Sequence, residues 1–178
     1  FYPGPGLGGH CIPIDPFYLT WKAREYGVAT RFIELAGEIN TMAPYHVVDK
    51  LVEALSSHKQ KALSGSRILM LGLAYKKNVE DTRESPAFTL IEELEKRGAA
   101  VEFYDPYVPT IPHMREHAAM AGRTSLPFDP AQFAAFDAVL ICTDHDNVDY
   151  AAIAAACDLI VDTRNAMRAS SHDGVVLA

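Results

Sequence analysis

An uninterrupted apolar run at residues 67–75, RILMLGLAY, restricts the possible folds of this chain more than any other stretch. A sheet with one face in water needs alternating polar and apolar residues, whereas a continuous run suits a parallel strand that is buried on both faces. Three further strand candidates follow, VEFYDP at 101–106, AVLICT at 138–143 and LIVDT at 159–163. We therefore expect an α/β domain with an open, mostly parallel sheet in the second half of the chain.

Helix signals lie between these strands. Ser85 and Pro86 are the residue types of a helix N-cap and of its first turn, and Gly98 follows at the expected end of that helix. Residues 109–123 and 150–156 are also expected to be helical. A strand, a helix and a second strand make a right-handed crossover, so the strands should share one direction.

Basic residues follow the expected strand ends. Lys76 and Lys77 come after the first strand and Arg164 after the last. Ligands of open α/β sheets bind outside the carboxyl ends of the strands, and such side chains suit a phosphate or pyrophosphate group. Ordinary solvated surface charge is the alternative for any one of them.

The first third of the chain has helical periodicity. Asp15 is a candidate N-cap, followed by Pro16 as the first residue of a helix that ends at Gly27. Apolar residues then recur at helical spacing through 32–39 and 47–55, and Pro44 is expected to divide them into two helices. The polar stretch SSHKQKALSGS at 56–66 is typical of a linker. We place the domain linker at 58–66, between a first unit at 1–57 and the α/β domain at 67–178.

Residues 1–16, FYPGPGLGGHCIPIDP, indicate a shaped loop. Glycine permits turns and the close approach of a ligand, and proline stiffens the turns between. Cys11 at its rim is a candidate covalent nucleophile, and Asp15 could orient a water. A flexible lead-in with a packed cysteine, and a purely capping role for Asp15, are the alternatives.

The net charge of −7 argues against a nucleic-acid binder and against binding to an anionic membrane. The three cysteines, Cys11, Cys142 and Cys157, are too widely spaced for a disulfide framework or a paired zinc site. Cys142 and Cys157 are expected to be packing residues. No run approaches the ~20 apolar residues of a membrane span, and we expect a cytoplasmic protein.

Two strings resemble a known family. GPGLGGHCIPIDPFYL resembles the catalytic loop of the UDP-glucose/GDP-mannose dehydrogenase family, the nucleotide-sugar 6-dehydrogenases, and KKNVEDTRESP resembles that family's second signature. HCIPIDPFYLTWKA is most similar to the branch that oxidises UDP-N-acetylhexosamines. The resemblance implies a Rossmann-like UDP-binding domain preceded by the end of a helical dimerisation domain, and hence a homodimer. It also implies a C-terminal piece that lacks the family's NAD-binding domain.

The resemblance further implies roles for single residues. Cys11 takes the position of the nucleophile, and Asp15 that of the residue assisting hydrolysis. The residues implied to contact the UDP-sugar are Tyr2, Pro3, Gly4, Pro5, Gly6, Leu7, Gly8, Tyr75, Lys76 and Arg164. Those implied to contact the cofactor NAD are Cys11, Ile12, Pro13, Ile14 and Arg83.

The implied reaction is the four-electron oxidation of the C6 alcohol of a UDP-sugar to the uronate, in polysaccharide biosynthesis. It passes through a thiohemiacetal and a thioester on Cys11, and the piece by itself is expected to be inactive. One rival function is a free-standing nucleotide-binding module without catalysis. Another is a thiol acyl hydrolase with His10 as base, which we disfavour because adjacent loop residues point in different directions.

Two further patterns carry little weight. GPGLGG imitates the dinucleotide fingerprint G-x-G-x-x-G, but no strand precedes it. Asp144, His145 and Asp146 could be drawn as part of a metal site, but no other ligands follow at a typical spacing. We interpret these three residues as a solvated loop at a strand end.

Overall fold

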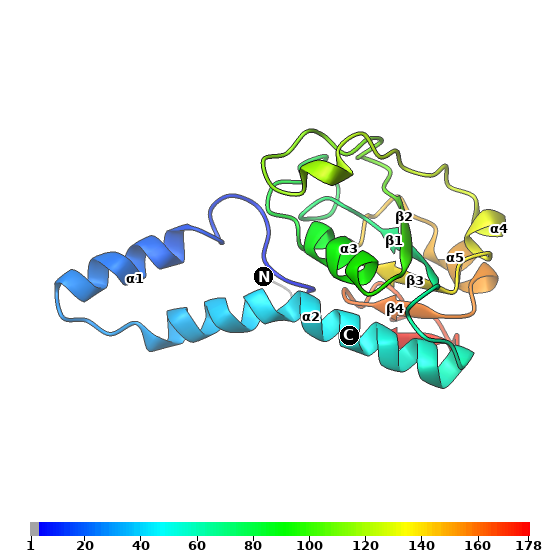
Figure 1. Ribbon diagram of the computed structural model, residues 1–178, viewed down its shortest axis with the longest axis horizontal. Coiled ribbons are helices and arrows are strands. Elements are labelled where there is room, and N and C mark those ends of the chain that lie inside the picture. The colour runs from blue at the N-terminus through cyan, green and yellow to red at the C-terminus, as the bar shows by residue number, and fades with distance from the viewer. Residues whose placement is uncertain (1–3) are drawn as a thin grey trace.

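The computed structural model describes residues 4–178 and contains a parallel α/β domain from which a helical hairpin projects (Figure 1). The five strands are β1 (Arg67–Leu71), β2 (Ala100–Tyr104), β3 (Ala138–Ile141), β4 (Ile160–Asp162) and β5 (Val175–Leu177). They form one sheet in the order β2-β1-β3-β4-β5, and every neighbouring pair is parallel. The expected open, Rossmann-like α/β fold is confirmed. β5, which is only three residues long, was not among the predicted strands.

Helices cover both faces of the sheet. α2 (Arg31–Lys59) and α3 (Pro86–Lys96) lie on one face, whereas α4 (Pro130–Phe133) and α5 (Tyr150–Ala156) lie on the other. Met70 packs in the core shared with α2 and α3, and its neighbour Leu69 packs in the core shared with α4 and α5. Because successive side chains of a strand point to opposite faces, a strand between two helical layers needs apolar residues throughout.

The N-terminus of α3 is formed as expected. Ser85 is the N-cap, its hydroxyl accepts a hydrogen bond from the Ala87 amide, and Pro86 is the first helical residue. The cap satisfies an amide that the helix itself leaves without a partner, and proline needs none at that position. This fixes the start of α3 beside the loop that follows β1.

Two expectations about the first helices were wrong. Asp15 is the first residue of α1 (Asp15–Glu25) and not its N-cap, because the preceding residue, Ile14, already has helical backbone angles. Pro44 lies inside α2, which is one helix of 29 residues. Proline leaves the carbonyl of Asn40 without its usual helical donor, and Gly6 approaches α2 at this point, close to both that carbonyl and the Pro44 ring. Tertiary packing of the glycine-rich loop covers the defect.

Two other segments also differ from expectation. The end of α2 extends through Lys59, so the connection to β1 covers only residues 60–66, with the buried Leu55 anchoring the last turns. Within residues 109–123 only a single 3-10 turn, Ala118–Met120, is helical. That segment instead makes a bridge between Thr110 and Thr124 and packs through buried apolar side chains. Its apolar residues imitated a helical period without forming a helix.

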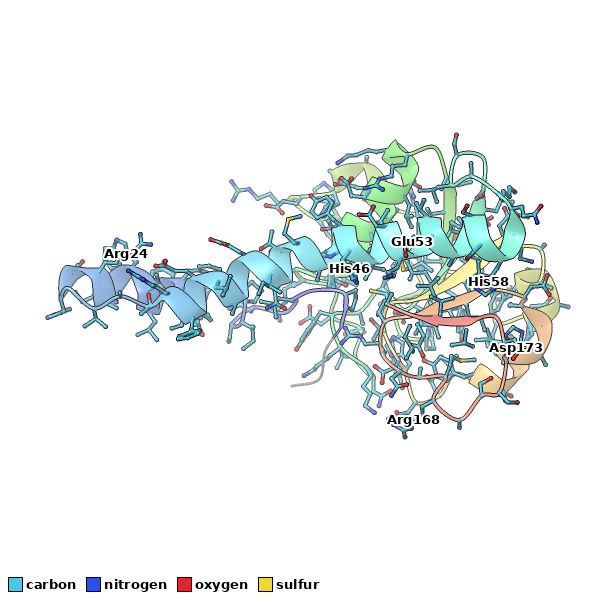
Figure 2. All side chains as sticks on the ribbon, turned by 90° about the horizontal axis from the view of Figure 1, so that it is seen from below. Arg24, His46, Glu53, His58, Arg168 and Asp173 are labelled. Atoms are coloured by element: carbon cyan, nitrogen blue, oxygen red, sulfur yellow. The ribbon has the colours of Figure 1, made fainter. Side chains whose placement is uncertain are left out.

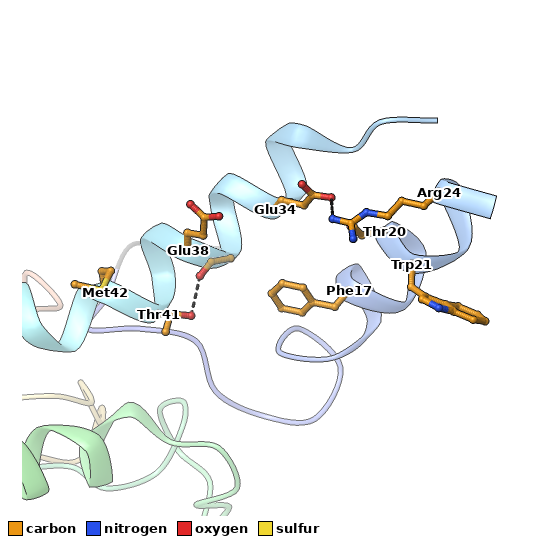
Figure 3. A pocket seen from close by; sticks show the side chains of 9 residues that line it. Phe17, Thr20, Trp21, Arg24, Glu34, Glu38, Thr41 and Met42 are labelled. Atoms are coloured by element: carbon orange, nitrogen blue, oxygen red, sulfur yellow. Dashed lines mark hydrogen bonds and ion pairs between the residues drawn. The ribbon is translucent and has the colours of Figure 1, made fainter. Parts of the chain in front are cut away.

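The hairpin consists of α1 and the first half of α2. Figure 2 shows that Arg24 lies at its far end, whereas His46, Glu53 and His58 lie where α2 crosses the α/β domain. Arg24 and Glu34 join the two helices through an ion pair of 2.6 Å. Between the helices lies a hollow of about 710 Å³, into which Phe17 points (Figure 3). Outside this hollow, the hairpin carries many exposed apolar residues; Phe32, for example, is 88% exposed.

Within residues 4–178, no helix is both long and apolar enough to cross a bilayer.

Candidate active site

The carboxyl ends of β1, β2 and β3 meet at one edge of the sheet because these strands are parallel neighbours. The loop at residues 72–85, which follows β1 and is called the β1 loop below, carries Tyr75, Lys76 and Arg83. Arg164 follows β4 at the same edge. The structure therefore brings together four of the basic and aromatic residues expected to contact substrate or cofactor.

A buried carboxylate organises this edge. Asp105, directly after β2, is 3% exposed. One of its oxygens accepts from the amides of Leu73 and Ala74, and the other from those of Tyr107 and Val108. Burial works to raise the pKa of Asp105, but hydrogen bonds from His145 and these amides outweigh it and hold the pKa below its ordinary value. The charged side chain ties the start of the β1 loop to the chain after β2.

His145 completes this cluster, so the interpretation of residues 144–146 as a solvated loop was wrong at its central position. The imidazole is fully buried, with Nε2 lying 3.1 Å from the Asp105 carboxylate and Nδ1 accepting from the Asn78 amide at 2.9 Å. The exposed Asp146 bonds Lys77 and the Asn78 side chain. Because the loops after β1, β2 and β3 follow neighbouring strand ends, the sequence predicts that they lie close together. No local pattern in the sequence showed that the His145 side chain turns inward.

Arg164 is held in place from two sides. The Asp162 carboxylate accepts the Arg164 amide at 2.8 Å, and Arg164 Nε donates to the Cys142 carbonyl at 2.7 Å. The guanidinium packs against Gly4, where a side chain would overlap it. Arg164 thus touches the glycine-rich loop, and its two Nη atoms bond no residue among those described, which leaves them to an anion. The thiol of Cys142 is buried, which raises its pKa to about 11, and Cys157 is buried as well, as expected.

The glycine-rich loop lies directly on the β1 loop. Gly9 donates its amide to the Arg83 carbonyl at 3.0 Å and has a φ of +84°, which favours glycine. A methyl group at Gly8 would lie 2.7 Å from Tyr75 Cβ and 2.9 Å from the Glu84 carbonyl oxygen. The absence of side chains at these two positions is therefore what allows the loops to meet.

Cys11 follows two residues later and is exposed. Its carbonyl accepts the amides of Ile14 and Asp15, at 3.1 and 2.8 Å, so Cys11 and Asp15 belong to one turn at the start of α1. Pro13 borders a hollow of about 320 Å³ that also includes Gly6 and Leu7. Tyr2 and Pro3 lie outside the described residues.

Arg83 lies on the Cys11 side of the β1 loop. Its guanidinium makes a two-pronged contact with the Asp81 carboxylate, at 2.6 to 3.1 Å. Asp81 raises the pKa of Arg83, and Cys11 contributes in the same direction because it lies within the range of charge interaction. Asp81 also accepts the Tyr75 amide through its carbonyl. Sequence reasoning missed Asp81 because an acidic residue in a polar loop has no distinguishing local signal.

Fold and site together define a parallel α/β domain of the nucleotide-binding class, with a glycine-rich cysteine loop docked on the basic carboxyl edge of its sheet. Residues 69–169 match the model for the UDP-binding domain of the UDP-glucose/GDP-mannose dehydrogenase family, and residues 1–42 match that family's central domain. The chain belongs to the UDP-glucose/GDP-mannose dehydrogenase family, as its two signature strings predicted.

Individual relatives agree. The chain is 36% identical, over 81% of its length, to UDP-N-acetyl-D-mannosamine dehydrogenase of Methanococcus maripaludis, and 31% identical, over 79%, to UDP-N-acetyl-D-glucosamine 6-dehydrogenase of Pseudomonas aeruginosa. It covers 30% and 32% of these proteins, so it spans about a third of their length. The structure of the UDP-D-ManNAc dehydrogenase from Pyrococcus horikoshii matches 99% of the chain with a TM-score of 0.78 and 31% identity, and 39% of that structure is covered.

Proposed function

We propose that the protein to which these residues belong is an NAD-dependent UDP-sugar 6-dehydrogenase. It oxidises the C6 alcohol of a UDP-N-acetylhexosamine to the uronate, in the cytoplasm, for polysaccharide biosynthesis. Relatives named for UDP-N-acetyl-D-mannosamine and UDP-N-acetyl-D-glucosamine support this substrate class. The observation that carries the proposal is the docking of the Cys11 loop on the basic strand edge through Gly9 and Arg83.

The substrate would lie across that edge. Lys76 is exposed beside Tyr75, with its ammonium 5.3 Å from the ring centroid. Arg164 is held through Nε, and its Nη atoms bond nothing within residues 4–178. These cations suit the two phosphates of UDP, and Gly4 to Gly8 line the path from them toward Cys11. A nucleotide bound at the sheet edge thereby extends its sugar toward the thiol.

Cys11 supplies covalent chemistry to this arrangement. Oxidation of a primary alcohol to a carboxylate removes four electrons, which NAD accepts as two hydrides, one to each of two molecules. Between these oxidations the Cys11 sulfur, having lost its proton, adds to the aldehyde carbon, and the carbonyl oxygen takes up a proton to give a thiohemiacetal. This intermediate loses its hydroxyl proton together with the second hydride to become a thioester. Water then attacks the acyl carbon, the C–S bond breaks, and the carboxylate leaves while the thiol regains a proton. We assign the orientation of that water to Asp15, whose amide bonds the Cys11 carbonyl in the same turn.

The described residues do not offer NAD a complete site. The turn after β1 has a single glycine, Gly72, where the dinucleotide fingerprint has three, and α3 begins with Ser85 and Pro86. Arg83 and the segment from Cys11 to Ile14 are the residues that we assign to the nicotinamide. The proposal therefore assigns the main hold on NAD to residues other than those described here, and expects residues 1–178 alone to be inactive.

A homodimer formed through the hairpin is part of the proposal. Phe32, Ile39 and Met42 of α2 are all more than half exposed, as are Leu19 and Trp21 of α1. Exposed apolar surface of this extent is typical of a contact with another polypeptide. The partition into 1–57, a linker and 67–178 is part of the proposal as well, although the second half of α2, with Leu51 and Leu55, packs into the core of the α/β domain.

Substitution of the thiol tests the proposal. In the full-length protein, Cys11→Ser should still bind UDP-sugar and NAD but form uronate at least ~10³-fold more slowly, because a hydroxyl is a weaker nucleophile. His10→Gln is the matched control: the neighbouring side chain is exposed, and its replacement should leave the rate unchanged. NADH release with a panel of UDP-sugars measures both. Wild-type uronate formation by Cys11→Ser would refute the mechanism, and NAD-independent thioester hydrolysis lost in His10→Gln would favour the hydrolase.

A further inference from the structure

We infer that His145 is a positioning residue that holds the β1 loop, and through it the cysteine loop, in the substrate-binding arrangement. The inference deepens the proposed function and rests on it for the identity of the ligand. The His145 side chain touches neither the substrate nor the reacting atoms. Its role is to be a fixed hydrogen-bond acceptor beneath the β1 loop.

The hydrogen bonds determine the tautomer of His145. The Asn78 amide donates to Nδ1, so Nδ1 carries no proton. Nε2 must then carry the proton of the neutral ring and donate it to Asp105 Oδ2. Tyr107 packs over the imidazole with a centroid separation of 4.9 Å. The buried ring is thus held in one orientation, with its acceptor nitrogen facing the β1 loop.

Asp105 makes this orientation rigid. The backbone amides that it accepts come from the segments after β1 and after β2, and its side chain is fully buried. If the His145 donor is removed, the four backbone amides still satisfy the buried charge, so Asp105 stays in place and the main cost is to stability. Asp105, at the end of β2, therefore holds Nε2 of His145, and Nδ1 of the same ring holds the Asn78 amide of the β1 loop.

Asn78 is the point where the loop is held. Its backbone has a φ of +62°, a region that asparagine tolerates better than most residues. Its side chain pairs with Asp146, but that pair lies in solvent and contributes little by itself. The bond from the Asn78 amide to the buried His145 is better protected from water and is therefore the firmer anchor.

A continuous set of contacts leads from this anchor to the thiol. Three residues beyond Asn78, Asp81 accepts the Tyr75 amide and pairs with the Arg83 side chain. The Arg83 carbonyl accepts the Gly9 amide, and Cys11 lies two residues further along. Release of Asn78 should therefore loosen Lys76 and Arg83 first. The consequence is weaker nucleotide binding, with less effect on the chemical step.

Two substitutions separate the two nitrogens of the ring. In His145→Asn the amide oxygen can occupy the place of Nδ1 and accept from Asn78, but nothing reaches Asp105. In His145→Gln the amide nitrogen can occupy the place of Nε2 and donate to Asp105, but Asn78 loses its acceptor. Both variants are polar and remove the ring. They differ in which of its two hydrogen bonds they retain.

The measurements use the full-length protein, with UDP as the probe. Loss of one buried hydrogen bond corresponds to about tenfold in affinity. We expect His145→Gln to weaken UDP binding about tenfold by calorimetry, to raise the KM for UDP-sugar more than it lowers kcat, and to speed exchange of the Asn78 amide hydrogen about tenfold. His145→Asn should remain within about threefold of wild type on all three. Asp146→Asn, at the exposed partner of Asn78, should leave amide exchange unchanged.

Amide exchange and the ¹⁵N shifts of the imidazole need no ligand, so they test the positioning role even if UDP does not bind. Equal effects of His145→Asn and His145→Gln on exchange would overturn the inference. If neither variant folds, the wild-type spectrum decides alone: an Nε2–H tautomer supports the inference, and an Nδ1–H tautomer or a doubly protonated ring at neutral pH overturns it. Failure of wild-type protein to bind UDP would instead refute the proposed function.

Discussion

Gly72, the first residue after β1, should be one of the least replaceable positions in the chain. Its φ is +83°, and a methyl group there would lie 2.5 Å from Thr143 Cβ, 2.7 Å from the Thr143 carbonyl oxygen and 3.0 Å from Thr143 Cα. Thr143 cannot move away, because its hydroxyl donates to the Ala74 carbonyl and its amide to the Leu71 carbonyl. The clash is therefore with fixed backbone and not with the end of a flexible side chain.

The chain offers a matched control at Gly122, whose φ is also +83° but whose surroundings are open, with nothing within 4 Å of an added methyl group. A non-glycine residue in this backbone region costs about 1–2 kcal/mol, and overpacking adds about 1–3 kcal/mol. Gly122→Ala should therefore lower the free energy of unfolding by about 1–2 kcal/mol, and Gly72→Ala by about 2–5 kcal/mol.

Urea denaturation of the full-length variants, followed by circular dichroism, measures both values, and thermal melts should order them in the same way. For a domain of this size each kcal/mol shifts Tm by about 2–4 °C. Equal destabilisation by Gly72→Ala and Gly122→Ala would refute the argument, because it would mean that Thr143 yields and that only the backbone angle matters.

Two further predictions concern the docked loop and the sheet's opposite edge. Gly9→Ala places a methyl group 2.8 Å from the Tyr75 ring at a φ of +84°. The variant should therefore lower kcat/KM at least about tenfold, while it changes global stability less than Gly72→Ala does. Wild-type kinetics of Gly9→Ala would contradict the docking of the two loops. Burial works to raise the pKa of Asp137, but bonds from Lys61 and the Arg67 amide outweigh it and lower the pKa. The charged Asp137 therefore stabilises the fold above the carboxyl pKa of ~4 in the unfolded chain, and this stabilisation is lost as the pH falls through the lower pKa of the folded state. Asp137→Asn should lower the free energy of unfolding by ~1 kcal/mol at pH 7, and this difference from wild type should vanish in acid. A pH-independent difference in urea midpoints would oppose this.

The elements of the α/β domain were predictable where the chemistry is local. Ser85 and Pro86 start α3 because capping involves residues two or three positions apart. The runs of β1 and β3 were recognisable because central strands that are buried on both faces consist almost entirely of apolar residues. The strand at Val175–Leu177 was not, since three apolar residues occur in any kind of structure.

Errors arose where distant contacts outweighed local preference. Pro44 remains inside α2 because the glycine-rich loop packs over the exposed carbonyl, and residues 109–123 follow the surface of the domain instead of coiling. In the site, Cys11 and Arg164 were candidates from sequence. His145 was wrongly placed in solvent, because its burial depends on Asp105, forty residues earlier.

The class of the fold, the family with its two signature strings, and the residues proposed for chemistry could all be inferred from the amino-acid sequence, because each depends on neighbouring residue types. Three features became visible only in the folded chain: the cysteine loop lies on the strand edge, Asp105 and His145 support it from within, and the hairpin presents an apolar surface. These features join segments far apart in the chain. Their free energy comes from contacts that form only when the sheet is assembled.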